Sequence, residues 1–296
     1  MENRIPKKRT VTRRDFVKGA ALGTLGLALG LGKSNAQAQS AVSQVVLIRK
    51  DEAVDAQHNV NPKVVAEMID AALLAFSGEK DVLKAWRQFI RPEDTVGVKY
   101  TRCSWMRIQT EQAVVDAITQ RLTDVGVQNN RIYAQDGGLP AKDCTVLINV
   151  PTIKVHTLAG LASCLKNYIN FSPQPSAYHE DKNDKLGEVW HLPDVKGKTR
   201  LIIVDALRPY FGPGPQINPL HRWDYKGIMV STDPVALDAT SLSICKVKRR
   251  LFKGEDWPIT PPPKLIAAAD TIYHLGTSDP AKIKLIKLGW KQDILI

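Results

Sequence analysis

Short apolar runs alternate with longer segments of helical periodicity along most of the chain. The apolar runs predict strands at 45–49, 95–100, 131–134, 145–150, 201–204, 227–230 and 282–288. Apolar positions three and four residues apart predict helices at 62–76, 81–90, 111–125, 157–168, 234–247 and 264–273. The run at 145–150 is apolar at almost every position, which is typical of a strand buried on both faces of a parallel sheet. This alternation favours an α/β fold, and we predict a mixed, mainly parallel sheet with helices on both faces in a single domain, 39–296.

Local signals mark the ends of some of these elements. Asn61-Pro62 opens the first predicted helix, and Thr110 is expected to cap the helix at 111–125. An insertion rich in proline, glycine and polar residues, at 172–198, interrupts the alternation of strands and helices.

The first forty residues have a different pattern from the rest of the chain. Residues 12–18, Thr-Arg-Arg-Asp-Phe-Val-Lys, contain a twin-arginine pattern, and an uncharged run at 19–32 and a small-residue site at 36–38 follow it. This order of basic, apolar and cleavage regions is that of an export signal. We therefore predict a twin-arginine signal peptide at 1–38, cleaved near Ala38. The implied partner is the twin-arginine translocase, and the implied destination is the periplasm.

The apolar run of the leader is short. Its fourteen residues, at ~1.5 Å each, fall short of the ~30 Å hydrocarbon core, so we expect no stable membrane anchor. An uncleaved signal that stays in the membrane is the alternative. The twin-arginine pathway carries folded proteins, often with a cofactor already bound. The leader therefore favours a cofactor without naming one.

The formal net charge of +11 is concentrated in the leader. Removing its eight basic and two acidic residues leaves 33 basic and 28 acidic residues, a net charge of +5. A modest positive charge favours small anionic ligands or lipid headgroups. The basic residues form no stripe with interleaved aromatic residues, so we expect no binding to nucleic acid.

The cysteines are Cys103, Cys144, Cys164 and Cys245. Because they include no Cys-x-x-Cys pair, we expect no structural zinc and no cysteine-ligated iron–sulfur cluster. Two interpretations remain open for the thiols. In an oxidising compartment they can form up to two disulfides, in one of three pairings. Their apolar neighbours favour buried free thiols instead, and we expect at least two of these.

Polar side chains are concentrated where the fourth predicted strand ends. Residues 149–157 are Asn-Val-Pro-Thr-Ile-Lys-Val-His-Thr, and Lys166 and Asn167 follow within the next predicted helix. Ligands of open α/β sheets bind at the carboxyl ends of the strands. Lys154 and His156 alternate onto one face of extended backbone and can converge on one ligand. Taken singly, each residue also fits a structural role, such as a solvated lysine or a hydrogen-bonded histidine.

Two further candidate segments follow later strands. Asp205 comes just after the strand at 201–204, and Gly212 and Gly214 follow in a segment where the backbone can approach a ligand closely. A Pro/Gly turn is the alternative, and neither the phosphate-loop pattern nor the dinucleotide fingerprint is matched. Asp238 lies inside a predicted helix between apolar residues, where an unpaired carboxylate is costly to bury. We therefore expect Asp238 to be functional or ion-paired.

In combination, these segments resemble the family known as domain of unknown function 362. The resemblance extends from about Val45 to Gly289. It is carried by Val96-Gly97-Val98-Lys99, residues 149–156, Lys166-Asn167, Ile203-Val204-Asp205, residues 212–215 and residues 231–238. It implies a redox or cofactor-associated protein and adds Lys99 to the candidate ligand-binding residues. Some relatives carry a ferredoxin-like module with clustered cysteines, which this chain lacks. The family's proline and asparagine after the lysine are Tyr100 and Thr101 here.

These observations predict an exported protein with one polar pocket. Its expected members are Lys99, Lys154, His156, Lys166, Asn167, Asp205 and Asp238, with Gly212 and Gly214 beside the ligand. We expect the lysines to hold an anionic group such as a carboxylate or phosphate. We expect His156, Lys154 and Asp238 to be catalytic, with His156 as general base or, together with Asp205, as metal ligand.

Two functions are consistent with such a pocket. The leading hypothesis is a cofactor- or metal-dependent periplasmic enzyme that acts on a small anionic ligand, with redox chemistry as one option and the reaction left open. The alternative is a non-catalytic periplasmic protein that binds such a ligand or accompanies a redox partner.

Overall fold

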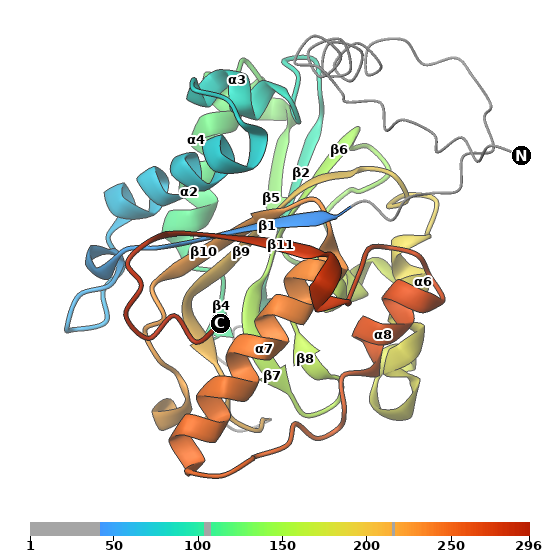
Figure 1. Ribbon diagram of the computed structural model, residues 1–296. Coiled ribbons are helices and arrows are strands. Elements are labelled where there is room, and N and C mark those ends of the chain that lie inside the picture. Colours follow the sequence, from blue (N-terminus) through green and yellow to red (C-terminus); the bar gives the residue numbers. More distant parts are fainter. Residues whose placement is uncertain (1–41, 104–107, 215–216) are drawn as a thin grey trace, which may run out of the picture. The chain divides into compact units, whose positions relative to one another are not determined.

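A mixed sheet forms the centre of the computed structural model, which describes residues 42–103, 108–214 and 217–296 (Figure 1). The strands run in the order β11-β1-β10-β9-β6-β2-β5, and β7 and β8 extend the sheet from β9. The bounds are β1 (Ser43–Arg49), β2 (Val96–Tyr100), β5 (Ile132–Gln135), β6 (Val146–Val150), β7 (Thr152–His156), β8 (Gly160–Ala162), β9 (Thr199–Tyr210), β10 (Gly227–Ser231) and β11 (Ile283–Gly289). A separate ribbon pairs β3 (Arg102–Cys103) with β4 (Ile108–Gln109).

Most strand pairs of this sheet are parallel, as the sequence predicts. The parallel pairs are β1–β11, β2–β5, β2–β6, β6–β9 and β7–β9. The antiparallel pairs are β1–β10, β9–β10 and β7–β8. The predicted fold class, a mixed and mainly parallel α/β sheet, is therefore confirmed.

The long strand β9 pairs with both β6 and β7, so these two strands follow one another along its edge. Its first part pairs with β6 and its second part with β7, where Thr152 is opposite Asp205. Between β6 and β7, the Pro151 carbonyl accepts a hydrogen bond from the Asp205 amide (2.8 Å). Because Tyr100, the last residue of β2, is opposite Val150, all of β7 extends beyond the carboxyl end of β2. This offset leaves polar residues of β7 beside the end of the sheet.

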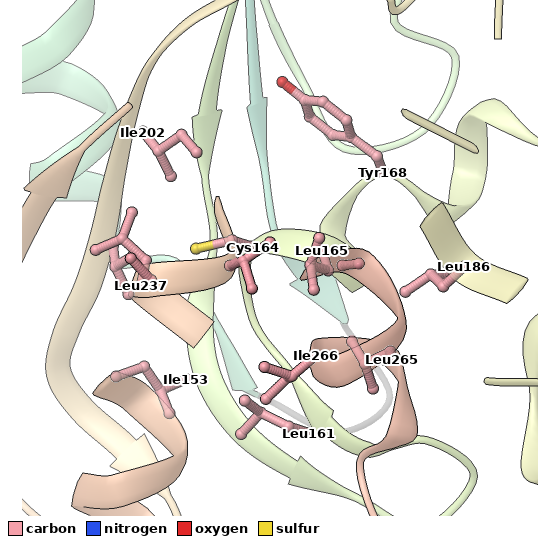
Figure 2. Packing of buried hydrophobic residues seen from close by; sticks show 14 of the residues in the cluster. Ile153, Leu161, Cys164, Leu165, Tyr168, Leu186, Ile202, Leu237, Leu265 and Ile266 are labelled. Carbon is pink, nitrogen blue, oxygen red and sulfur yellow. The ribbon is translucent and has the colours of Figure 1, made fainter. Parts of the chain in front are cut away.

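Helices cover both faces of the sheet (Figure 1). One face carries α2 (Pro62–Ser77), α3 (Val82–Arg87) and α4 (Gln112–Asp124), and the other carries α5 (Cys164–Asn167), α7 (Pro234–Lys253) and α8 (Lys264–Thr271). Side chains of a strand alternate between faces, so Val46 and Ile48 belong to the core under α2, whereas Val45 and Leu47 belong to the core under α7. Figure 2 shows part of the second core. The described residues form one compact unit.

The ends of two helices follow the sequence signals. The Asn61 side chain accepts a hydrogen bond from the Val64 amide at the start of α2. Asp233 caps α7 in the same way, with Pro234 in the first helical position. The prediction for α4 was wrong, because the Thr110 hydroxyl donates to the Val150 carbonyl (2.8 Å) instead of capping the helix.

The predicted helix at 157–168 is also wrong, since most of this segment is a β-hairpin. β8 pairs antiparallel with β7, and only the single turn α5 is helical. Gly160 has a φ of +74°, and a Cβ atom there would lie 2.5 Å from the Pro261 carbonyl oxygen. Close packing of a distant proline-rich segment therefore overrides the helical periodicity.

The insertion at 172–198 folds over α5. It contains short helical turns, among them α6 (Gly187–Trp190). The indole of Trp190 donates to the Leu165 carbonyl (3.0 Å) and stacks on Tyr168 with the ring centroids 4.4 Å apart. The insertion therefore closes one side of the region where the polar residues gather.

Three of the four cysteines are buried free thiols, namely Cys144, Cys164 and Cys245. This confirms the expectation of at least two buried thiols. The side chain of Cys103 lies outside the described residues, as do Pro215 and the predicted leader at 1–38 with its Arg13-Arg14 pair and cleavage site. Within the described part of the chain, no helix is long and apolar enough to cross a membrane.

Candidate functional site

A cleft of about 390 Å³ opens where β2, β5 and β7 end and α5 begins. Its polar lining comes from segments that are far apart in the sequence: Thr101, Arg102, Asp136, Lys154, His156, Ser163, Lys166, Asn167, Asn170 and His179. The carboxyl ends of parallel strands form this edge of the sheet, which is where open α/β sheets bind ligands. Four of the predicted pocket residues, Lys154, His156, Lys166 and Asn167, therefore line one cleft.

A buried lysine forms the floor of this region. The Lys99 ammonium is fully buried and contacts the Asp136 carboxylate at 2.5 Å and the Asn167 side-chain oxygen at 3.3 Å. Burial lowers the pKa of Lys99, whereas the charge of Asp136 opposes this shift. Lys99 thus does not line the cleft itself, but it contacts two residues that do, Asp136 and Asn167.

Asparagine side chains connect β2, β6 and α5. The Asn167 amide donates to the Lys99 carbonyl (2.8 Å) and to the Asn149 side-chain oxygen (2.7 Å). The Asn149 amide in turn donates to the Cys164 carbonyl (2.9 Å). Both side chains are buried, so this network fixes the position of α5 against the sheet.

Asp238 supports the same short helix from below. Its two carboxylate oxygens accept hydrogen bonds from the Cys164 amide (2.7 Å) and the Leu165 amide (3.0 Å) at the start of α5. Burial raises the pKa of Asp238 to about 6, and these backbone hydrogen bonds oppose the shift. The structure therefore makes Asp238 a positioning residue for Lys166 and Asn167, and it does not line the cleft.

The rings of two histidines that line the cleft lie parallel to each other. The rings of His156 and His179 have centroids 5.8 Å apart and an interplanar angle of 4°. Burial lowers the pKa of His156 to about 2, with further lowering by the charges of Lys166 and Lys154. Burial and Lys166 lower the pKa of His179 to about 4. Both rings are therefore neutral near pH 7.

Hydrogen bonds assign a different role to each ring. The Leu158 amide donates to Nδ1 of His156 (3.1 Å), so the neutral ring carries its proton on Nε2. Nε2 of His179 lies 2.9 Å from the Lys166 ammonium, which can only donate, so the proton of His179 is on Nδ1. His156 is thus a hydrogen-bond donor on its Nε2 side, whereas His179 orients Lys166. A general base would need an unprotonated nitrogen facing the ligand.

The charges that line the cleft are mainly positive. Arg102, Lys154 and Lys166 contribute three cationic groups, and Asp136 is the carboxylate among the described lining residues. Lys99 already pairs with Asp136. An anion that enters the cleft would therefore meet an excess of positive charge in a partly desolvated site.

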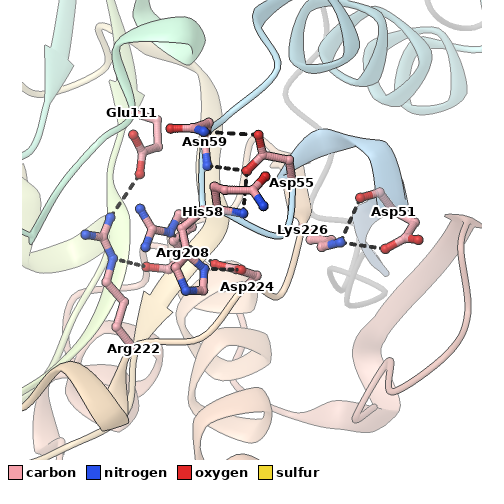
Figure 3. A network of polar contacts seen from close by, with 10 residues as sticks. Asp51, Asp55, His58, Asn59, Glu111, Arg208, Arg222, Asp224 and Lys226 are labelled. Atoms are coloured by element: carbon pink, nitrogen blue, oxygen red, sulfur yellow. Dashed lines mark hydrogen bonds and ion pairs between the residues drawn. The ribbon is translucent and has the colours of Figure 1, made fainter.

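Asp205 lies away from this cleft. Its carboxylate accepts hydrogen bonds from the Glu111 amide (2.6 Å) and the Leu207 amide (2.9 Å). Glu111 also pairs with Arg222 (2.9 Å), in the polar network of Figure 3. Burial raises the pKa of Asp205 to about 7. Asp205 pairs with Thr152, the first residue of β7, whereas His156 is the last residue of that strand. Four residues of extended strand separate the backbone positions of Thr152 and His156 by roughly 13 Å.

The predicted metal pair of His156 and Asp205 is therefore not brought together. Among residues 42–103, 108–214 and 217–296, no group of three histidine, cysteine, aspartate or glutamate residues is arranged to hold a metal ion. The charged side chains that lower the pKa values of the two cleft histidines, after burial, are lysines.

The predicted glycines have a packing role. A Cβ atom at Gly212 would lie 2.1 Å from Nδ1 of His221, so only glycine fits against that ring. Neither Gly212 nor Gly214 lines the cleft. The Pro/Gly turn is the interpretation that agrees with this placement.

Sequence reasoning missed Arg102, Asp136 and His179, which all line the cleft. Arg102 follows the end of β2. Asp136 directly follows β5, and the rule that ligands bind at strand ends would have found it. His179 lies in the insertion, where no periodic pattern indicates which side chains turn inward.

A family model described as Domain of unknown function (DUF362) matches residues 51–243. The chain belongs to the DUF362 family. The DUF362 match contains the whole cleft together with Asp205 and Asp238, whereas α8 and β11 follow it. Comparisons with curated proteins and with solved structures returned no match.

Proposed function

We propose that this DUF362 protein binds a small anionic ligand in the cleft beside α5. The observation that carries the proposal is the convergence of three cationic side chains, Lys154, Lys166 and Arg102, on one cleft in which Asp136 is the carboxylate among the described lining residues. Ammonium and guanidinium groups are the usual partners of phosphate, sulfate and carboxylate. A volume of about 390 Å³ is suitable for a small molecule.

The histidines add selectivity to this proposal. A neutral His156 with its proton on Nε2 can donate to an anion without contributing a charge, as argued above from its contact with the Leu158 amide. His179 keeps the Lys166 ammonium in place. The lysines would then attract the anion by charge, and the Nε2 hydrogen bond of His156 would fix the orientation of the bound anion.

An enzyme that acts on the same anion is the second candidate. The observation that favours it is the position of Asp136. Its carboxylate lines the cleft beside the cationic side chains and lies 2.5 Å from the Lys99 ammonium. Such a carboxylate can exchange a proton with a ligand. Such an enzyme could also use a cofactor or a metal ion, and its reaction could be a redox reaction.

We further propose that the chain works in the periplasm after export by the twin-arginine translocase. The support is the ordered leader, in which a twin-arginine pattern at 12–18 precedes an uncharged run and a small-residue site. The two proposals are independent, because the cleft lies entirely within residues 101–179.

Calorimetric titration of the purified protein with sulfate and with inorganic phosphate tests the binding proposal. We expect Lys166→Met to weaken binding roughly tenfold to a hundredfold, because it removes one charge-assisted hydrogen bond of about 1.5–3 kcal/mol. Lys84→Met is the matched control, since Lys84 is exposed on α3. Absence of binding by both anions, or equal weakening in the two variants, would contradict the proposal.

A further inference from the structure

Exposed apolar side chains gather at the carboxyl end of α7, which lies at the edge of the described domain (Figure 1). Leu251 and Phe252 on this helix are 64% and 48% exposed, and Leu220 in a loop is 73% exposed. The Phe252 ring lies beside the rings of His221 and Trp257, with centroids 5.2 Å and 6.3 Å away. Because Leu220 directly precedes His221, these side chains belong to one region of the surface. We call Leu220, Leu251, Phe252 and Trp257 the α7 patch.

Cationic side chains flank the α7 patch. Lys246, Arg250 and Lys253 are exposed on α7, and Lys248 is partly exposed. Lys246 and Arg250 line a hollow of about 330 Å³ together with the half-buried Trp257. Positive charge and apolar surface therefore meet at the same end of the helix.

This combination of side chains exceeds what the fold requires. Basic residues in the last turn of a helix interact with its dipole, which is a structural role for two of the cations. The dipole does not account for the exposed leucines, whose apolar surface gains free energy when it leaves water. Two carboxylates, Glu255 and Asp256, follow the helix, so the four cations keep the surface positive. Exposed apolar patches with a polar rim are typical of interaction sites.

We infer that the α7 patch docks the protein reversibly on an anionic membrane surface. The boundary between lipid headgroups and acyl chains offers negative charge to the cations and an apolar medium to Leu251 and Phe252. Lysine and arginine stems extend from such a boundary into the headgroups, and tryptophan rings favour the same depth. A nucleic acid would pair with the cations but would leave the leucines in water.

The docking is separate from the anion binding proposed for the cleft. The patch residues lie within 220–257, whereas the described residues that line the cleft lie within 101–179. Sulfate affinity in the cleft and vesicle affinity at the patch can therefore be measured independently in one protein.

Vesicles of brominated phosphatidylcholine and phosphatidylglycerol test the inference on the full chain. Bromine quenches a tryptophan that enters the bilayer, and the predicted leader at 1–38 contains no tryptophan, so leader adsorption alone gives no quenching. We expect quenching that weakens at high salt or with phosphatidylcholine alone, because the attraction is electrostatic in part. Trp257→Phe should remove most of it. Trp290→Phe should keep it, since that ring lies against Arg49 instead.

The apolar and cationic side chains should contribute separately to vesicle affinity. Leu220→Gln and Leu251→Gln should each weaken binding about threefold to tenfold, because each removes apolar surface from the bilayer. Arg250→Gln should weaken it about fivefold through the loss of one charge. Ile272→Gln and Lys84→Gln are the matched controls, exposed on other elements, and should bind as the wild type does.

Three results would overturn the inference. The first is absence of quenching by anionic vesicles at low salt. The second is equal quenching in the wild type and in Trp257→Phe, which would place the membrane contact elsewhere in the chain. The third is self-association that Leu251→Gln abolishes, without vesicle binding, which would assign the α7 patch to a second copy of this chain.

Discussion

At the scale of single residues, positive charge controls the chemistry of the cleft. Burial, and after it the charge of neighbouring lysines, lowers the pKa values of both histidines, so the cleft holds neutral imidazoles beside cationic ammonium groups. Lys154 and His156 could be predicted as neighbours from strand alternation alone, because residues two apart on a strand share a face. The sequence could not indicate that Lys166 would be among the charges that act on His156. That proximity depends on the hairpin and on α5.

The low pKa values of the histidines predict an unusual pH profile for anion binding. With folded pKa values of about 2 and about 4, neither His156 nor His179 gains a proton between pH 8 and pH 7, and Asp238, with a pKa of about 6, stays mainly ionised there. Sulfate keeps its charge in this range, so its dissociation constant should change less than about twofold. A step with a midpoint near pH 6.5 that disappears in His156→Gln would contradict this assignment.

At the scale of elements, α5 is the support of the site although it has a single turn. A helix this short is unstable alone, because nucleation is costly. Buried partners hold it instead, with Asp238 at its first amides and Asn149 at the Cys164 carbonyl. The sequence indicated that Asp238 needed a partner, since an unpaired buried carboxylate is costly. It could not indicate that the partner is the backbone of a segment 73 residues away.

Removal of the Asp238 carboxylate should therefore affect both stability and binding. Asp238→Ala leaves two buried backbone donors unpaired, at about 1–3 kcal/mol each, so the free energy of unfolding should fall by about 2–5 kcal/mol. Sulfate affinity should fall as well, because Lys166 and Asn167 belong to α5. Urea unfolding and calorimetry measure the two effects. Asp116→Ala is the control, since Asp116 is exposed on α4, and a loss as small as that of the control would refute the role of Asp238.

At the scale of the whole described domain, periodicity predicted the sheet well. Seven apolar runs correspond to β1, β2, β5, β6, β9, β10 and β11, because each lies in a sheet with both faces covered by helices. The extension of β9 to Tyr210 and the β7–β8 hairpin could not be predicted. The extension of β9 depends on pairing with β7, about fifty residues earlier in the chain, and the hairpin depends on close packing of Gly160 against Pro261; local patterns contain neither contact. The cleft lies at these unpredicted elements, so its membership was only partly recoverable from the sequence.

The proposed export concerns the chain as a whole, and it predicts a result for the arginine pair. Replacing Arg13-Arg14 with Lys-Lys should leave unprocessed protein in the cytoplasm, because the receptor of the twin-arginine pathway reads the arginines. Replacing Lys7-Lys8 with Ala-Ala keeps the pair and should allow export. Fractionation and mass measurement of the amino terminus give the readout.

The pathway carries folded proteins, so Asp238→Ala should also lower the periplasmic yield, but for a different reason. The retained Lys-Lys protein should still bind sulfate with wild-type affinity, whereas the retained Asp238→Ala protein should not. Lys-Lys protein recovered from the periplasm at normal levels and cleaved near Ala38 would show that another route exports this chain.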